Sequence, residues 1–258
     1  MLIDTHCHIF FPEYDADRAD VIARARVAGV GKMLVVGTDI ASSEKAIALA
    51  ESYSFLFAAV GLHPHDAKTM DDALLQKLEQ LSSHPKVVAI GETGLDFYYN
   101  RSEEDVQRQA FSAQIALAKK RRLPVVIHIR DAWDAAFDIL EKEDKDYFRE
   151  VGSVFHCFTG DKEIAARATA MGIYISFSGI VTFAKTAPLK EAAASIDPHF
   201  LLIETDCPFL APQGFRGKRN EPAYIATTAK EIAGLRNISE ERLAEITTAN
   251  AERVFRLS

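Results

Sequence analysis

The stretch Leu2-Ile3-Asp4-Thr5-His6-Cys7-His8 opens the chain as a short apolar strand that ends in two histidines. In an extended strand, side chains two residues apart project from the same face, so Asp4, His6 and His8 are predicted to point the same way. A His-x-His pair at a strand end suits a divalent metal, because each neutral imidazole offers one nitrogen lone pair. For this pair alone, local hydrogen bonding of two partly buried histidines is the alternative.

Seven further apolar runs follow, each separated from the next by a longer amphipathic segment. Strands that alternate with helices at this spacing form parallel βαβ units, and eight such units favour an α/β fold, the closed (β/α)8 TIM barrel. A doubly wound nucleotide-binding sheet is less favoured, because no Gly-x-Gly-x-x-Gly turn follows the first strand. No linker interrupts the pattern, so a single domain over residues 1–258 is predicted. The predicted strands are 2–5, 33–37, 56–60, 87–91, 125–128, 153–156, 173–177 and 201–205, and the predicted helices are 16–28, 42–52, 71–81, 104–121, 132–141, 162–170, 186–194, 222–235 and 240–255.

The composition is that of an ordinary soluble globular protein, with 258 residues, 48% hydrophobic and 26% charged. No apolar run is long enough to span a bilayer and no signal peptide is recognisable, which predicts a cytoplasmic protein without membrane association. The three cysteines, Cys7, Cys157 and Cys207, are odd in number and far apart, so reduced thiols are expected rather than disulfides. The net charge of -7 gives no global attraction for nucleic acid, although it leaves room for a local positive site.

Metal-binding types of side chain stand at the carboxyl ends of six predicted strands. In barrels of this kind, active sites lie at that end of the strands. A single histidine at the end of a buried strand is more often a core residue, but six strands ending in such side chains at one rim predict a metal centre. These side chains are His6, His8, His63, His65, Glu92, His128, His156 and Asp206.

This donor set exceeds what one four-coordinate ion needs, which predicts two divalent metal ions. Glu92 stands between two groups of histidines and is predicted to bridge ions about 3.5 to 4 Å apart. The imidazole-rich set suits zinc best, with manganese, nickel and cobalt as alternatives. Magnesium is a weaker alternative, because it prefers oxygen ligands. One ion is assigned to His6, His8, Glu92 and Asp206, and the second to Glu92, His128 and His156.

Eight short runs spread over the chain contain these residues and their neighbours. They are IDTHCH (3–8), GLHP (61–64), GETGLD (91–96), PVVIHIR (124–130), HCFTG (156–160), ETDCP (204–208), RGKRNEP (216–222) and NAERVF (250–255). As a set they resemble the TatD family of metal-dependent deoxyribonucleases. The resemblance implies a TIM barrel of the amidohydrolase type, two divalent metals and hydrolysis of DNA, often from an end. Phe10 departs from the family, whose members commonly carry Asp or Asn there, so the mouth of the pocket is expected to differ.

Two carboxylates are assigned to catalysis. Two ions would lower the pKa of a water between them from about 15.7 toward about 7, so that it could attack phosphorus. Asp206 is predicted to accept the proton of this water, with a purely ligating role as the alternative, while Glu92 holds both ions. Asp4 is predicted to orient an imidazole, and Glu204 to support Asp206 from behind.

The loops beyond the metals are predicted to hold DNA as the substrate, and no obligate protein partner is indicated. Cationic and imidazole side chains there suit phosphate groups, although each one alone also fits an ordinary solvated charge. The aromatic cluster of Phe97, Tyr98 and Tyr99 would either stack unpaired bases or pack onto the barrel rim. The predicted phosphate-binding residues are His63, Arg130, Lys185, Arg216 and Arg219.

Two other functions fit parts of the pattern. An amidohydrolase that cleaves a C–N or ester bond of a small molecule would use the same barrel and metals, but many such sites are bridged by a modified lysine where this chain has Glu92. A metal-stabilised nucleic-acid-binding protein without turnover would need closed coordination, whereas two ions that share one carboxylate usually leave positions open for water.

Overall fold

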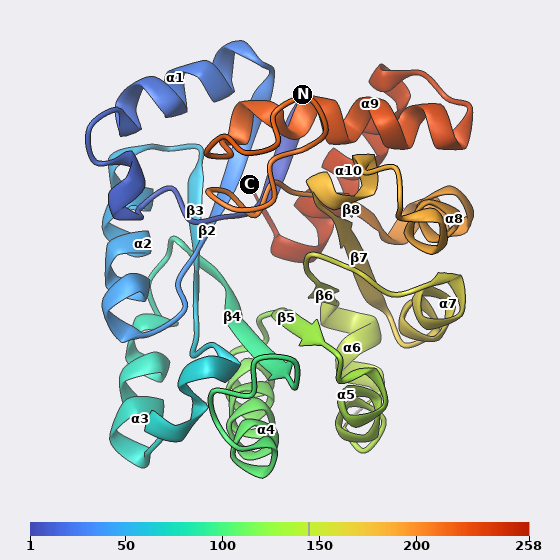
Figure 1. Cartoon of the computed structure of the whole chain (residues 1–258). Coiled ribbons are helices and arrows are strands. Elements are labelled where there is room, and N and C mark those ends of the chain that lie inside the picture. Colours follow the sequence, from blue (N-terminus) through green and yellow to red (C-terminus); the bar gives the residue numbers. More distant parts are fainter. Residues whose placement is uncertain (144, 258) are drawn as a thin grey trace.

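A computed structural model describes residues 1–143 and 145–257. Eight parallel strands form one sheet in the order β1 to β8, nearly closed into a barrel with helices around it (Figure 1), which confirms the predicted fold. The strands are β1 Leu2–Cys7, β2 Val30–Val36, β3 Leu56–Val60, β4 Val87–Asp96, β5 Val125–Arg130, β6 Ser153–Phe155, β7 Ile173–Phe177 and β8 Leu201–Ile203. The α-helices are α1 Arg18–Val27, α2 Ile40–Ser52, α3 Asp72–Leu81, α4 Glu104–Arg121, α5 Trp133–Leu140, α6 Lys145–Val151, α7 Lys162–Ala170, α8 Ala187–Ser195, α9 Ile225–Arg236 and α10 Glu240–Phe255.

The first and last strands meet at the carboxyl end of the barrel. The backbone N–H of His8 donates to the carbonyl oxygen of Cys207 (2.8 Å), and that of Asp206 donates to the carbonyl oxygen of His6 (2.9 Å). Cys7 and Cys207 form an isolated parallel bridge between these two bonds. The seam of the barrel therefore runs through the residues that carry predicted metal ligands.

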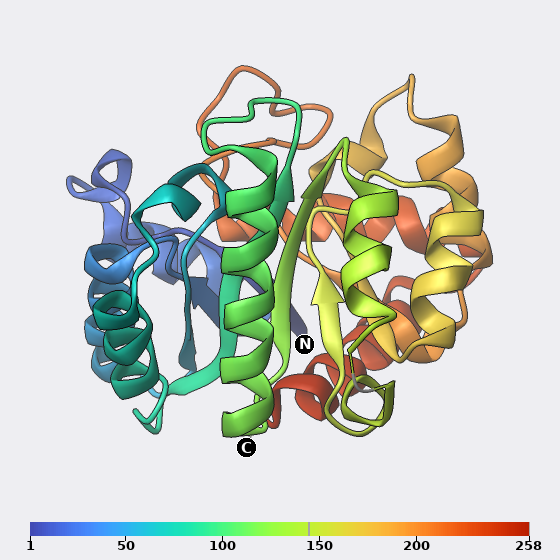
Figure 2. The same ribbon diagram turned by 90° about the horizontal axis from the view of Figure 1, so that it is seen from below.

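Apolar side chains fill the barrel and the layer between strands and helices. A smaller cluster takes at least one side chain from each of the eight strands, among them Ile3, Val126 and Leu202, and adds Val254 and Phe255 of α10. Each strand thus contributes to this inner cluster, and α10 covers the amino-terminal end of the barrel (Figure 2). Burial of each such large side chain stabilises the fold by about 1.5–3 kcal/mol. This packing leaves only the carboxyl end open for chemistry.

Two strands contain an extra residue close to predicted ligands. In β1, Asp4 pairs with Met33 and Cys7 with Val35, so β1 advances three residues while β2 advances two. Such a bulge reverses the alternation of side chains beyond it and re-aims them. Ile3 and His6 are three residues apart, so strict alternation would place them on opposite faces of the strand. Because of the bulge, both side chains point into the barrel.

The same irregularity occurs in β4, where Ile90 pairs with Val125 and Thr93 with Ile127. The extra residue falls at Gly91 or Glu92 and turns Glu92 toward the barrel axis. Further along, the backbone of β5 crosses so closely that a Cβ at Gly94 would lie 2.0 Å from the carbonyl oxygen of His128. Glycine is therefore required at this position.

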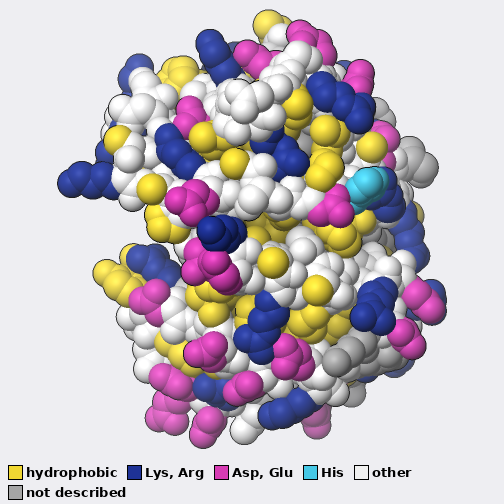
Figure 3. Space-filling model, turned by 90° about the vertical axis from the view of Figure 1, so that its right-hand side faces the viewer, with side chains coloured by type: hydrophobic (Ala, Val, Ile, Leu, Met, Phe, Trp, Pro, Cys, Tyr) yellow, Lys and Arg dark blue, Asp and Glu magenta, His cyan; other side chains and the backbone are white. Residues whose placement is uncertain are grey.

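On the side of the molecule seen in Figure 3, the surface has no large region that is only positively or only negatively charged. Basic and acidic side chains are interspersed there among apolar ones, and the outline is hollowed at the edge that corresponds to the front of Figure 1. In the described part of the chain, no helix combines the length and the apolar character that crossing a membrane would require. The short helix α6 was not predicted by the sequence, because seven residues are too few for a clear helical period.

Candidate metal centre

Glu92 lies at the centre of the predicted ligands, and its two carboxylate oxygens face different histidines. Oε2 lies 3.3 Å from Nε2 of His6 and 3.7 Å from Nε2 of His8. Oε1 lies 3.1 Å from Nδ1 of His128 and 2.9 Å from Nε2 of His156. The side chain is only 5% exposed. A carboxylate in this position can bridge two cations.

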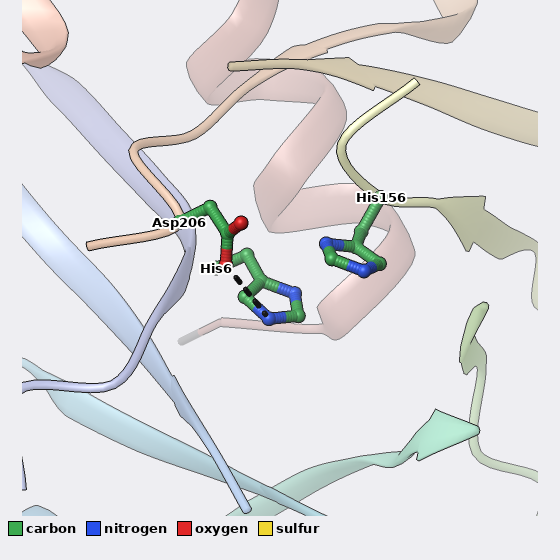
Figure 4. Close-up of side chains that lie close together, drawn as sticks. All are labelled: His6, His156 and Asp206. Carbon is green, nitrogen blue, oxygen red and sulfur yellow. Dashed lines mark ion pairs between the residues drawn. The ribbon is translucent and has the colours of Figure 1, made fainter. Parts of the chain in front are cut away.

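The first group of donors consists of His6, His8, Glu92 and Asp206. The Nε2 atoms of His6 and His8 are 3.2 Å apart, and Oδ1 of Asp206 lies 3.8 and 3.5 Å from them. Ligands about 2.1 Å from a tetrahedral ion stand about 3.4 Å apart, so these separations suit donors to one ion. The donor atoms of His6, His8 and Glu92 all lie within 4.8 Å of one another, as do those of His6, His156 and Asp206. Figure 4 shows Asp206 directed toward His6, with His156 beside them; the rings of His6 and His156 are stacked at 3.9 Å between centroids.

The second group of donors gathers on the other oxygen of Glu92. Nδ1 of His128 and Nε2 of His156 are 3.3 Å apart. His63, predicted from the sequence to bind phosphate, places its Nε2 atom 3.3 Å from Oε1 of Glu92. Its donor atom lies within 4.8 Å of those of Glu92 and His128. The structure therefore adds His63 to the candidate ligands of a second ion.

Hydrogen bonds behind the imidazole rings hold their orientation. His8 Nδ1 lies 2.7 Å from the carbonyl oxygen of Val36, which leaves Nε2 to face Glu92. Nε2 of His128 lies 3.2 Å from Oδ2 of Asp96, which leaves Nδ1 for the metal side. The same carboxylate oxygen is 2.9 Å from His65 Nε2. Partners of this kind select the ring tautomer and orient a ligand.

Sequence reasoning missed the role of Asp96. This buried residue ends β4, four positions after Glu92, and belongs to the GETGLD run. Its place at a strand end, in the same run as a predicted ligand, was the feature of the sequence from which its role could have been predicted. Burial opposes ionisation of Asp96, but hydrogen bonds from His128 and Tyr99 hold its pKa far below the ordinary value, so it stays negative.

Asp4 does not orient an imidazole, contrary to the prediction. Its carboxylate accepts hydrogen bonds from the backbone N–H and the hydroxyl of Thr205 (2.9 and 2.6 Å), and from the backbone N–H of His6 at 3.3 Å. The bulge in β1 separates Asp4 from the face of the histidines, which simple alternation placed together. Asp4 instead ties β1 to the segment beside Asp206.

Glu204 supports a different residue from the one predicted. Its Oε1 atom accepts a hydrogen bond from the backbone N–H of Cys157 (2.6 Å) and lies 3.4 Å from Nδ1 of His156. Strand alternation placed it behind Asp206, but β8 ends at Ile203 and Asp206 has a left-handed backbone with φ of 55°. Glu204 therefore orients His156 and the turn that follows it.

The electrostatics of the two groups favour a cation. Burial opposes ionisation of Glu92, but the charge of His156 and hydrogen bonds from His128 and His156 hold its pKa well below the ordinary value. Burial would lower the pKa of His156, but Glu92 and Glu204 raise it well above normal, which reports a strongly negative local field. Burial lowers the pKa of His63 to about 4, so this ring is neutral and able to bind metal at pH 7.

The cationic residues predicted to bind phosphate occupy different settings. Arg130 ends β5, and its guanidinium carbon lies 4.0 and 4.6 Å from the ring centres of Tyr98 and Tyr99. Lys185 is exposed before α8, and the exposed Arg216 lies 4.6 Å over the ring of Phe183. These three cations remain accessible to a ligand.

The guanidinium of Arg219 is already bound by other groups of the protein. Its guanidinium donates to both carboxylate oxygens of Asp17, at 2.8 and 2.7 Å, and to the carbonyl oxygen of Glu13. It also lies 4.5 Å over the ring of Tyr14. These contacts tie the loop after β8 to the turn before α1, so the observed role of Arg219 is to hold a loop rather than a phosphate.

The cysteines lie outside the groups of donors that could hold a metal among the described residues. Cys7 is buried and donates from Sγ to the carbonyl oxygen of Leu34 at 3.3 Å. Sγ of Cys157 lies 3.4 Å from the hydroxyl of Ser178, and Cys207 is buried. All three thiols are free.

Comparison with known proteins agrees with the sequence motifs. The sequence model of the family described as TatD-related DNase matches residues 3–256. The uncharacterized metal-dependent hydrolase YabD of Bacillus subtilis is 46% identical over 258 residues, which is 100% of both chains. The protein of Cronobacter sakazakii named 3'-5' ssDNA/RNA exonuclease TatD is 38% identical, over 98% of this chain and 97% of its own.

Solved structures show the same relationship. The crystal structure of YJJV, a TatD homologue of Escherichia coli, aligns with 99% of this chain and 98% of its own with a TM-score of 0.92 and 32% identity. An uncharacterized amidohydrolase of Saccharomyces cerevisiae, only 20% identical, shares the fold with a TM-score of 0.86 over 98% of this chain and 99% of its own. The family model, the relatives and the structural match together show that this chain belongs to the TatD family of metal-dependent hydrolases.

Proposed function

We propose that this hydrolase cleaves phosphodiester bonds of single-stranded DNA and RNA from the 3′ end, with two divalent ions in its active site. The observation that carries the proposal is the position of Glu92, whose two oxygens face two separate sets of nitrogen donors. Such an arrangement suits two metals that act on one phosphate. The substrate and the polarity are supported by the names of relatives, of which several are 3'-5' ssDNA/RNA exonucleases.

Both ions would be zinc by the chemistry of the donors, which are mostly imidazole nitrogens. Such ions, when bound, neutralise charge on the phosphoryl oxygens and lower the pKa of water. The first would be held by His6, His8, Glu92 and Asp206, and the second by Glu92, His128, His156 and His63.

Asp206 is placed to accept a proton during hydrolysis. Its side chain is 12% exposed, more than that of Glu92, so it reaches the opening of the site as well as the histidines. Burial opposes its ionisation, but the hydrogen bond with His8 and the charge of His6 keep its pKa below the ordinary value. The carboxylate is therefore ionised at neutral pH and ready to take a proton.

Arg130 is the best-placed side chain for binding the phosphate backbone. It stands two residues after His128 on the same strand, and Tyr98 and Tyr99 hold its guanidinium in one orientation. A fixed guanidinium binds phosphate through two parallel hydrogen bonds. Lys185 and Arg216, on neighbouring loops, would bind more distant phosphates.

The test uses protein stripped of metal and reloaded separately with zinc, manganese, nickel, cobalt or magnesium. Single-stranded DNA and RNA labelled at the 5′ end are incubated with each form, beside duplex DNA and simple ester and amide substrates. We expect progressive shortening of the single strands from the 3′ end, no shortening without metal, and shortening at least about 100-fold slower with Asp206→Asn. Hydrolysis of an amide or a small ester without cleavage of any nucleic acid would overturn the proposal in favour of the amidohydrolase alternative.

A further inference from the structure

Large apolar side chains are prominently exposed at few places in the described chain, and most of these places border the metal centre. Tyr98 is 59% exposed, and Tyr99 and Phe209 are each 50% exposed. The others are Met1 and Val27, which ends α1 just before β2 begins and so lies toward the amino-terminal end of the barrel. Exposed apolar side chains that gather at one site indicate a binding surface, whereas scattered ones do not.

Phe209 stands on the side of the first group of donors. Its backbone N–H donates to the carbonyl oxygen of Asp206 at 3.0 Å, so one tight turn separates this ring from a proposed ligand. The buried amide of Asn220 donates to the carbonyl oxygen of Phe209 at 2.6 Å and fixes the turn. The ring centre lies 6.3 Å from that of His8.

Phe11 repeats this arrangement on the neighbouring loop. Its N–H donates to the carbonyl oxygen of His8 at 2.9 Å, and its ring stacks on that imidazole with 5.1 Å between centroids. The rings of Phe11 and Phe209 are 5.9 Å apart. Two phenylalanines therefore form one rigid aromatic pair, each a single turn away from a proposed ligand of the first ion.

A second aromatic pair stands beside the other group of donors. The rings of Tyr98 and Tyr99 are 4.9 Å apart, with Arg130 against both. The N–H of Tyr99 donates to Oδ1 of Asp96 at 2.8 Å, and the other oxygen of Asp96 holds His128. This pair is thus tied to the second group as firmly as the phenylalanines are to the first.

The two pairs belong to different sides of the opening. The loop after β4, which carries Tyr98 and Tyr99, and the loop after β8, which carries Phe209, lie apart across the mouth of the barrel in Figure 1. Both rise beyond the strand ends in Figure 2. A strand whose phosphate lies at the metal centre would pass between them.

We propose that these pairs are two stacking platforms, which take unpaired bases on either side of the phosphate bound at the metal centre. Aromatic rings beside an accessible cation bind single strands of nucleic acid, because every base has a face that can stack. Bases within a duplex are already stacked and paired, so the platforms select single strands. This inference rests on the proposed function and adds to it the residues that recognise the substrate.

The test measures the affinity of metal-loaded protein for a short single strand with phosphorothioate linkages, which slow cleavage. The strand is used intact, or with one base removed at either of its two 3′-terminal positions. We expect Phe209→Ala to weaken binding of the intact strand by about 5- to 160-fold, the range given by base–aromatic stacking. We expect this loss to vanish when the base at one of the two positions is missing, because the ring then has nothing to stack on.

Three further variants sharpen the result. Tyr98→Ala should weaken binding of the intact strand to the same extent, and this loss should vanish when the base at the other of the two terminal positions is missing. Phe209→Trp keeps an aromatic ring and should bind the intact strand as tightly as the wild-type protein does. Val27→Ala removes an exposed apolar side chain far from the site and should change nothing. Metal content is measured for every variant.

A loss that is equal for the intact strand and both base-deleted strands, or no loss at all, would overturn the platforms. Cleavage of an unmodified strand by the wild-type protein is assayed in parallel. Absence of cleavage refutes the proposed function itself, whereas cleavage without coupling to a base refutes only the platforms.

Discussion

Glu92 concentrates more of the site's chemistry than any other residue, because each of its oxygens faces its own set of nitrogen donors. Glu92→Ala should therefore lose both metal ions, whereas His156→Ala should chiefly weaken one. Metal content of the purified variants, measured by mass spectrometry, tests this. Glu163→Ala, which changes an exposed glutamate on α7, serves as the control and should keep both ions. Full metal content in Glu92→Ala would exclude a bridging role.

Asp206 combines a ligand's position with access to the opening. Asp206→Asn preserves the shape of the side chain but removes its charge and its ability to accept a proton. We expect the fold to persist and the rate of hydrolysis to fall by about 10²- to 10⁴-fold, the usual contribution of general acid–base catalysis. Circular dichroism and steady-state kinetics measure the two effects. Near-normal turnover with normal metal content would show that Asp206 is not the proton acceptor.

At the scale of residues, the sequence predicted which side chains meet but not how each is oriented. His6, His8, His128 and His156 stand at strand ends, and the barrel brings all such ends to one rim. The orientation of Asp4, the partner of Glu204 and the recruitment of His63 depend on bulges and irregular segments. These arise from pairing between strands distant in sequence, which local alternation does not describe.

Among the elements, the loop after β8 depends on a contact far away in the sequence. Hydrogen bonds from Arg219, and to a lesser degree from Arg24, lower the pKa of Asp17 from its ordinary 3.8 to about 2. A carboxyl with a lowered pKa stabilises the fold at pH values above its unfolded pKa, and this contribution is lost as the pH falls toward the folded pKa.

Asp17→Asn should therefore lower the melting temperature at pH 7 by at most about a few degrees, since exposed ion pairs contribute little. The difference from wild type should shrink as the pH falls from about 4 to about 2. Asp20→Asn, an exposed change on α1, is the matched control and should leave the melting temperature unchanged. A difference that persists undiminished at pH 2 would show that the ion pair is not its cause.

Strands and helices were easier to predict than the connections between them. Eight apolar runs alternating with helical periods are sufficient for a parallel barrel, because the right-handed βαβ unit allows few other arrangements. In the loop after β8, the apolar residues follow neither the helical nor the strand period. Its contact with Asp17 therefore required the structure, and the sequence alone led to Arg219 being assigned to phosphate.

For the whole molecule, the metal centre joins residues at the ends of strands all around the barrel. Ions that bind only the folded state stabilise it by mass action, by about 2.7 kcal/mol at a free metal concentration 100 times the dissociation constant. Added zinc should raise the melting temperature of the stripped protein, and a chelator should reverse the rise. The gain should disappear under acid conditions as the histidines become protonated and release the metal.

Differential scanning calorimetry with and without chelator measures this effect. The Glu92→Ala variant supplies the control, because a protein without the bridging carboxylate should show almost the same melting temperature in both conditions. A wild-type melting temperature that does not respond to metal at pH 7 would contradict the site.

The seam between β1 and β8 also determines when the metal centre can form during synthesis of the chain. His6 and His8 leave the ribosome among the first residues, but the bonds that position them come from Asp206 and Cys207, about two hundred positions later. A nascent chain can hold the histidines of the first group long before it can offer the carboxylate that completes this group. On the proposed assignment, loading of the first metal ion would therefore be one of the last events in the maturation of the chain, and a translation product arrested before β8 would be left without it.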